Sequence, residues 1–181
     1  MRIALLGIGN IMFSDEGIGV HLCRYIEQKY RFTSEIHTLD FIDGGTLAER
    51  LIPIIVQYDY VIILDCISAD DGKCGDVYFF DFDDIPKHIS WQGSAHEVEM
   101  LQTLTMMDIL GDRPKTKIIG IIPQVVADTT LELTKPVKEG AKVMESVVVK
   151  HLKELGFNID TVNKELDIQE TAFKFGTYEG R

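Results

Sequence analysis

Residues 1–19 read MRIALLGIGNIMFSDEGIG, and this stretch decides how the rest of the chain is interpreted. Ile3–Leu6 is a short apolar run that ends at Gly7, which predicts a buried strand followed by a glycine turn. Ser14 or Asp15 is placed to cap the helix that follows, because both side chains can accept hydrogen bonds from the first N–H groups of a helix. A strand, a glycine turn and a helix are the first unit of an α/β fold.

Segments of two kinds alternate along the remaining chain. Short apolar runs predict further strands at Glu35–Phe41, Tyr60–Leu64, Asp76–Asp81 and Lys117–Ile122. Helical spacing of apolar residues predicts helices after Ile18, over Leu47–Ile55, after Ser94 and from Val137 to Leu155. This alternation favours a central, largely parallel sheet covered on both faces. We expect a single α/β catalytic domain over residues 1–156 and a C-terminal extension, residues 157–181, without a strong period.

The composition limits the possible partners. The chain has 181 residues, and 18 basic against 29 acidic side chains give a net charge of −11. Nucleic acids and anionic membrane surfaces bind clustered Lys and Arg, so we expect neither as a partner, and an acidic surface is compatible with a monomer. No run approaches the ~18 apolar residues of a membrane span. The three cysteines form no CxxC motif, which favours a reduced, cytoplasmic protein.

Acidic residues and glycines follow the predicted strands. The first strand is followed by Gly7-x-Gly9 and Asp15-Glu16, the second by Asp43-Gly44-Gly45-Thr46, and the third by Asp65. Ser94-Ala95-His96 precedes the third main helix. Because the binding sites of such sheets lie outside the carboxyl ends of the strands, Glu16, Asp65 and His96 can converge there from three separate loops.

Together, Glu16, Asp65 and His96 would form a mixed oxygen and nitrogen ligand set. Such a set suits a divalent cation such as zinc or nickel, and three protein ligands leave positions open for water or substrate. Each residue also has an ordinary alternative, since Glu16 favours a helix N-terminus, Asp65 fits a turn, and a single histidine is common on a surface. The residues by themselves leave both interpretations open.

A dinucleotide site is the competing interpretation of the same edge. Gly7-x-Gly9 after a strand is the start of the dinucleotide-binding fingerprint. Met12, however, stands where the third glycine belongs, and Asp15 and Glu16 occupy the helix start where a pyrophosphate needs bare N–H groups. A nucleotide-binding oxidoreductase or transferase is therefore an alternative that these departures weaken.

The combined pattern resembles the [NiFe]-hydrogenase maturation endopeptidases. It consists of Gly7-x-Gly9-Asn10-x-x-x-x-Asp15-Glu16-Gly17-x-Gly19, Asp43-Gly44-Gly45-Thr46, Asp65, Ser94-x-His96 and Gly120-x-x-Pro123, and it extends over about residues 1–155. The resemblance implies a three-layer α/β/α sandwich with a twisted, mostly parallel central sheet of about five strands. It also implies a cytoplasmic endopeptidase that removes the C-terminal extension of a hydrogenase large-subunit precursor after nickel is inserted.

The resemblance implies roles for particular residues as well. Residues matching Glu16, Asp65 and His96 contact the metal, and Asp43 is a further functional candidate. The candidate catalytic residues are then Asp43, Asp65 and Glu16, and the candidate metal ligands are Glu16, Asp65 and His96. Nickel is the expected metal, supplied by the precursor, and another divalent cation can take its place in vitro.

The chemistry and the exact function stay open at this stage. Aspartic-type hydrolysis and metal-assisted hydrolysis both fit the residues, because a carboxylate can act as a general base and a metal can polarise a carbonyl group. A non-catalytic metallochaperone for the same precursor is a further alternative. Residues 157–181 have no clear counterpart in the family pattern, so their role, including docking of one particular precursor, is also open.

Overall fold

A five-stranded sheet forms the centre of the molecule. The computed structural model describes residues 1–46, 48–90, 95–126 and 129–176, and for residues 90 and 95–98 it describes the backbone alone. The strands are β1 (Arg2–Ile8), β3 (Thr38–Gly45), β4 (Tyr60–Cys66), β6 (Val77–Asp81) and β8 (Lys115–Ile121), in the order β3-β1-β4-β8-β6. All pairs are parallel except that of β6 with β8. The prediction of a mostly parallel sheet is confirmed.

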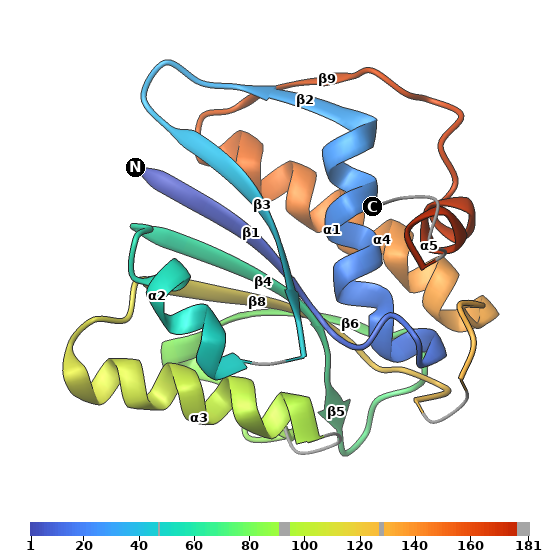
Figure 1. Cartoon of the computed structure of the whole chain (residues 1–181), viewed down its shortest axis with the longest axis horizontal. Helices are drawn as coiled ribbons and strands as arrows, with labels where there is room; N and C mark the ends of the chain where they lie inside the picture. The colour runs from blue at the N-terminus through green and yellow to red at the C-terminus, as the bar shows by residue number, and fades with distance from the viewer. Residues whose placement is uncertain (47, 91–94, 127–128, 177–181) are drawn as a thin grey trace.

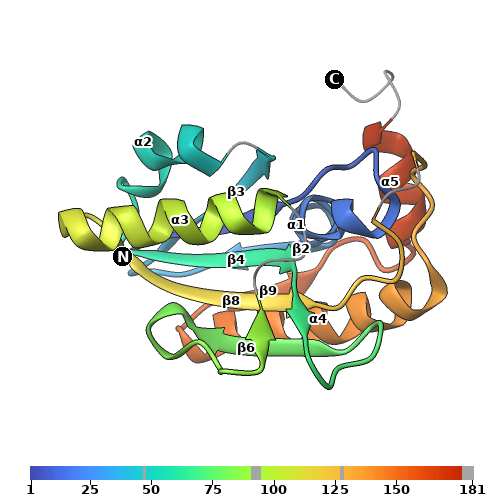
Figure 2. The same cartoon turned by 90° about the horizontal axis from the view of Figure 1, so that it is seen from below.

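Helices cover both faces of the sheet (Figure 1). One face is covered by α1 (Ile18–Lys29), α4 (Lys135–Glu154) and α5 (Ile168–Gly176), and the other by α2 (Ile52–Ile55) and α3 (Ala95–Leu110). Figure 2 shows the sheet from a second direction, again with α3 and α4 on opposite sides. The expected α/β/α sandwich is therefore confirmed.

The central strands explain why two apolar cores form. Every residue of β4 is buried, as a continuous apolar strand between two helical layers requires. Successive side chains point to opposite faces, so Ile62 and Leu64 pack with α1 and α4 while Val61 and Ile63 pack with α3. The short apolar run in the sequence thus corresponds to a strand that is buried on both faces.

Smaller elements complete the fold. They are the antiparallel pairs β2 (Tyr30–Thr33) with β9 (Asn158–Thr161) and β5 (Ser68–Ala69) with β7 (Ile89–Ser90), and the 3-10 turns η1 (Ser14–Gly17), η2 (Ala48–Leu51) and η3 (Phe82–Asp84). The pair of β2 with β9 was not predicted, and β3 begins later than the predicted strand and runs through Asp43-Gly44-Gly45. The C-terminal segment supplies β9 and α5, and α5 packs beside α1 (Figures 1 and 2). Among the described helices, none is both long and apolar enough to cross a membrane.

Candidate functional site

Glycines allow the loop after β1 to fold back onto the sheet. Gly9 has a φ of +133°, and a Cβ at this position would overlap the carbonyl oxygen of Glu16. A Cβ at Gly19, in the first turn of α1, would overlap the carbonyl oxygens of Ile8 and Leu64. These glycines therefore allow backbone segments of the protein to approach one another at the ends of β1 and β4. The glycine pattern was the main argument for a dinucleotide site, and these contacts explain it without a bound nucleotide.

Asp65 is the penultimate residue of β4, and it is buried. Its Oδ1 accepts a hydrogen bond from the backbone N–H of Cys66 at 2.8 Å. The Cys66 thiol donates to the carbonyl oxygen of Asp15 at 3.2 Å, and Glu16, which is also buried, is the next residue. The fold thus brings the backbones of Glu16 and Asp65 together at the carboxyl edge of the sheet, from positions far apart in the sequence.

His96 is the second residue of α3, and its side chain lies outside the described part of the structure. Figure 1 shows that α3 begins near β5, which follows the carboxyl end of β4, and runs back along the sheet. Among the side chains that the structure describes, no three from His, Cys, Asp and Glu form a group able to hold a metal ion. His96 is not among those side chains.

Asp15 has a different role from the helix cap that its position predicts. Its carboxylate is buried and accepts hydrogen bonds from the backbone N–H groups of Gln124 and Val125 at 3.0 Å and from the N–H and hydroxyl of Thr134 at 2.8 Å. Neither Asp15 nor Ser14 caps a helix with its side chain, so the cap prediction is wrong. The donors come from the segment between β8 and α4, and Asp15 ties that segment to the loop that contains Glu16.

Asp43 borders a cavity of about 190 Å³ at the same edge. Its Oδ1 accepts a hydrogen bond from the Gly45 N–H at 3.0 Å, and its Oδ2 forms an ion pair with Arg24. The hydrogen bond from Gly45 is typical of an aspartate in a turn. The ion pair with Arg24 instead holds the carboxylate at the wall of the cavity. A carboxylate held in this way can accept a proton from a water molecule beside a bound substrate.

Two further residues, Arg24 and Phe175, line this cavity and lie outside the predicted site residues. The other lining residues are Gly9, Asn10, Ile11, Gly45 and Thr46, which belong to the two glycine-containing motifs. Arg24 lies within α1 and Phe175 within α5, so neither belongs to a recognisable motif. The Cζ atom of Arg24 lies 4.9 Å from the centre of the Phe175 ring, a cation–π contact that only the packing of α5 on α1 creates.

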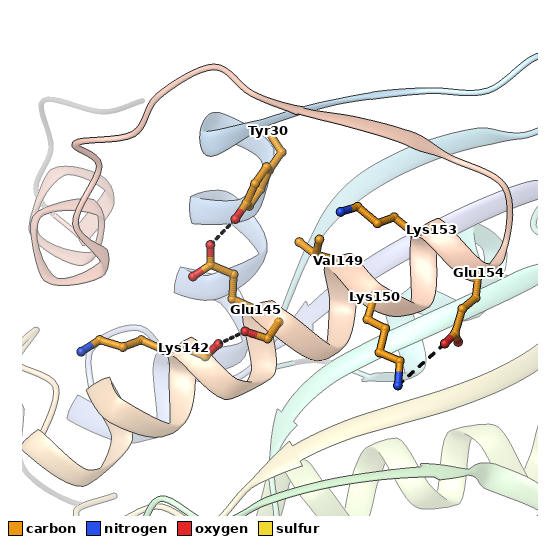
Figure 3. Close-up of a pocket in the computed structure, with 8 residues that line it drawn as sticks. Tyr30, Lys142, Glu145, Val149, Lys150, Lys153 and Glu154 are labelled. Atoms are coloured by element: carbon orange, nitrogen blue, oxygen red, sulfur yellow. Dashed lines mark hydrogen bonds and ion pairs between the residues drawn. The ribbon is translucent and has the colours of Figure 1, made fainter.

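A larger cavity of about 530 Å³ lies elsewhere, on the outer side of α4 (Figure 3). Glu145 on its wall accepts a hydrogen bond from the Tyr30 hydroxyl at 2.6 Å and forms an ion pair with Lys29 at 2.7 Å. Because α1 starts at the carboxyl edge and its 12 residues extend about 18 Å, Tyr30 lies towards the opposite edge. This cavity is therefore separate from the predicted site, and its contacts connect α1 to α4.

Comparison with known proteins places the chain in a family. The sequence profile described as "Hydrogenase maturation protease" matches residues 20–151. The chain is 51% identical over 147 residues to the protein HydD of Wolinella succinogenes, which covers 81% of this chain and 92% of HydD. It is 30% identical over 125 residues to the hydrogenase 2 maturation protease of Escherichia coli, with 68% and 74% covered. The solved structure of the hydrogenase maturating endopeptidase HybD from E. coli matches with a TM-score of 0.77 at 27% identity, over 90% of this chain and 98% of HybD. The chain therefore belongs to the hydrogenase maturation protease family, whose members process hydrogenase large-subunit precursors.

Proposed function

We propose that this protein is an endopeptidase that removes the C-terminal extension of a nickel-loaded [NiFe]-hydrogenase large-subunit precursor. The nickel ion belongs to the precursor and serves as the recognition anchor, which Glu16, Asp65 and His96 contact from the protease side. The observation that supports this proposal is the approach of the Glu16 and Asp65 backbones at the carboxyl edge through the hydrogen bond from Cys66 to Asp15. His96 follows at the start of α3.

The donor types fit a shared metal ion. Two carboxylates and an imidazole provide hard and borderline ligands, and thiolates of the precursor would provide the soft ligands that nickel also accepts. Contact with the ion fixes the precursor relative to the protease and so positions the scissile bond. A precursor without nickel lacks this anchor, which explains why processing would follow metal insertion.

Asp43 is the general base that we favour for hydrolysis. Its carboxylate borders the cavity at the sheet edge and is oriented by Arg24 and the Gly45 N–H. A positioned general base contributes about 10²–10⁴-fold to a rate. Asp65 and Glu16 are the other carboxylates able to take part, and polarisation of the scissile carbonyl by the precursor's metal is the metal-assisted alternative.

We also propose that the protein acts in the cytoplasm as a monomer. Cys23, Cys66 and Cys74 are all free in the structure, which fits a reducing compartment. The net charge of −11 favours mutual repulsion between copies of the chain. Gel filtration of the purified protein tests the monomeric state directly. Elution at the volume expected for a dimer would contradict it.

Mass spectrometry of the precursor tests the function. The protein is incubated with a nickel-loaded precursor and, in parallel, with the same precursor freed of metal. We expect loss of the C-terminal extension from the loaded precursor and cleavage of the metal-free precursor that is slower by at least about 100-fold, because the anchor is missing. Equal cleavage of the two would contradict nickel-anchored recognition, and binding without any change in mass would indicate a metallochaperone.

Variants then test the residues. Asp65→Asn and His96→Ala should abolish processing, and Glu16→Gln should weaken binding to the loaded precursor, because a neutral amide is a poorer ligand than a carboxylate. Glu139→Gln, which changes an exposed carboxylate on α4, is the matched control and should process normally. Circular dichroism melts identify any variant that fails only because it is unfolded. Full processing by Asp65→Asn would remove Asp65 from the proposed site.

A further inference from the structure

The cavity beside Asp43 is built from four segments of the chain. Gly9 and Asn10 come from the loop after β1, Asp43 and Gly45 from the end of β3, Arg24 from α1 and Phe175 from α5. The first two segments belong to the motifs that identify the family, whereas the last lies in the C-terminal extension. The C-terminal extension, which shows no strong period in the sequence, therefore helps to form the wall of a cavity at the candidate site.

Arg24 connects these segments. Its Nη2 pairs with Asp43 Oδ2, and its guanidinium group lies over the Phe175 ring. Its Nη1 is buried and has no hydrogen-bond partner among the residues that the structure describes. A buried N–H group without an acceptor is unfavourable for folding, so stability alone does not explain why the guanidinium group lies here.

On the basis of the proposed function, we propose that Arg24 is a positioning residue for Asp43 and that α5 forms a wall of the substrate pocket through Phe175. The ligand of this pocket is the polypeptide segment of the precursor beside the scissile bond. Arg24 lines the cavity and keeps 23% of its side chain exposed, so backbone carbonyl oxygens of that segment can approach this exposed part. The C-terminal helix thereby takes part in holding the precursor.

The contacts favour a role in the site over a role in stability. The side chains of Arg24 and Asp43 are 23% and 39% exposed, and ion pairs as exposed as this one contribute little to folding. Among the residues that the structure describes, none lies within 4 Å of a Cβ built at Gly45, so these residues leave space beside Asp43. Such an arrangement leaves room for a peptide next to a carboxylate that is already oriented.

Arg24→Gln tests the positioning role with the full-length protein and the nickel-loaded precursor. Because Asp43 loses its orienting partner, we expect kcat to fall by about 10-fold to 100-fold while the thermal melt stays near that of the wild type. Arg24→Lys, which keeps the positive charge, should recover part of kcat. Lys142→Gln removes an exposed lysine paired with Glu139 on α4 and should leave processing unchanged. An Arg24→Gln variant with wild-type kcat would overturn the positioning role.

Phe175→Ala tests the wall formed by α5. We expect KM for the precursor to rise by about 10-fold with kcat reduced much less, because the variant loses contact with the substrate and keeps Asp43 in place. Phe173→Ala is the matched control, since Phe173 lies in the same helix, is 42% exposed and does not line the cavity. Equal KM values for the wild type and both variants would show that α5 has no part in binding the precursor.

The outcomes separate this inference from the proposed function. If the wild type does not cleave the loaded precursor, the proposed function fails, and the positioning role fails with it. If the wild type cleaves and Asp43→Asn is inactive while Arg24→Gln is fully active, only the positioning role fails. If Asp43→Asn is fully active, Asp43 is not the base and Arg24 cannot act through it, whereas the comparison of Phe175→Ala with Phe173→Ala still decides the role of α5.

Discussion

His21 is the residue whose surroundings differ most from those of a typical side chain of its kind. It is completely buried in α1, with the backbone of Ile11 beside its ring, and neither ring nitrogen forms a hydrogen bond of good geometry among the described residues. A Cβ at Gly17 would lie 2.9 Å from its Nε2, so the glycine makes room for the ring. Burial and, to a smaller extent, the charge of Arg24 lower the pKa of His21 to about 4. The ring is therefore neutral in the folded protein at pH 7.

This histidine makes stability depend on pH. The unfolded chain binds a proton at His21 near pH 6.5, whereas the folded protein resists it down to about pH 4, so stability falls as the pH drops through this window. Between pH 7 and pH 5 we expect a loss of about 2 kcal/mol from this group. Urea unfolding at both values measures it. His21→Gln cannot take up the proton and should lose less stability over the same interval, and an equal loss in the two proteins would refute the assignment to His21.

At the scale of elements, the close approach of α1 to the sheet determines the geometry of the carboxyl edge. Gly19 allows the first turn of α1 to touch the backbones of β1 and β4. The same turn follows η1, which contains Glu16. A helix start displaced from the sheet would therefore move Glu16 away from Asp65.

Gly19→Ala should disturb both stability and processing. The added methyl group overlaps the carbonyl oxygens of Ile8 and Leu64, which are backbone atoms and cannot rotate away. We expect destabilisation at the upper end of the about 1–3 kcal/mol typical of overpacking. Gly111→Ala is the control, because no described residue lies within 4 Å of its Cβ and the positive φ of +77° is what opposes the change. Thermal melts compare the two, and a smaller loss for Gly19→Ala than for Gly111→Ala would contradict the packing argument.

At the scale of the whole molecule, the candidate site and the network that stabilises helix packing lie towards opposite edges of the sheet. The carboxyl edge holds Glu16, Asp65 and the cavity beside Asp43, whereas Glu145 connects α4 with the end of α1 towards the other edge (Figure 3). Although burial lowers the pKa of Lys29, its contacts with Glu145 and Tyr25 raise that pKa more strongly, so the Lys29 ammonium group stays charged. The hydrogen bonds and ion pair of this network join α1 to α4, and they lie towards the edge opposite the candidate site.

Glu145→Gln should separate stability from activity. Glu145 is 9% exposed, and loss of its charge weakens the bonds to Lys29 and Tyr30, with an expected cost of about 1–3 kcal/mol. Glu139→Gln, which breaks an exposed ion pair with Lys142, should cost at most about 1 kcal/mol. Chemical denaturation measures both variants. Below its melting temperature Glu145→Gln should process the precursor at the wild-type rate, and a large fall in that rate would connect this network to the site.

The sequence by itself determined the mostly parallel sheet, its helical layers and the family, because apolar periodicity and short motifs are local properties of the chain. It also placed Glu16 and Asp65 at strand ends, from which their common edge follows. The prediction that Asp15 caps a helix was wrong, because it considered only neighbouring residues. The hydrogen-bond donors to its carboxylate lie 109 to 119 residues away in the sequence. Only the tertiary structure decided that Arg24, Asp43 and Phe175 share a cavity, because their contacts depend on how α1 packs against both α5 and β3. Long-range packing leaves no periodic trace in the sequence, so no local pattern could reveal it.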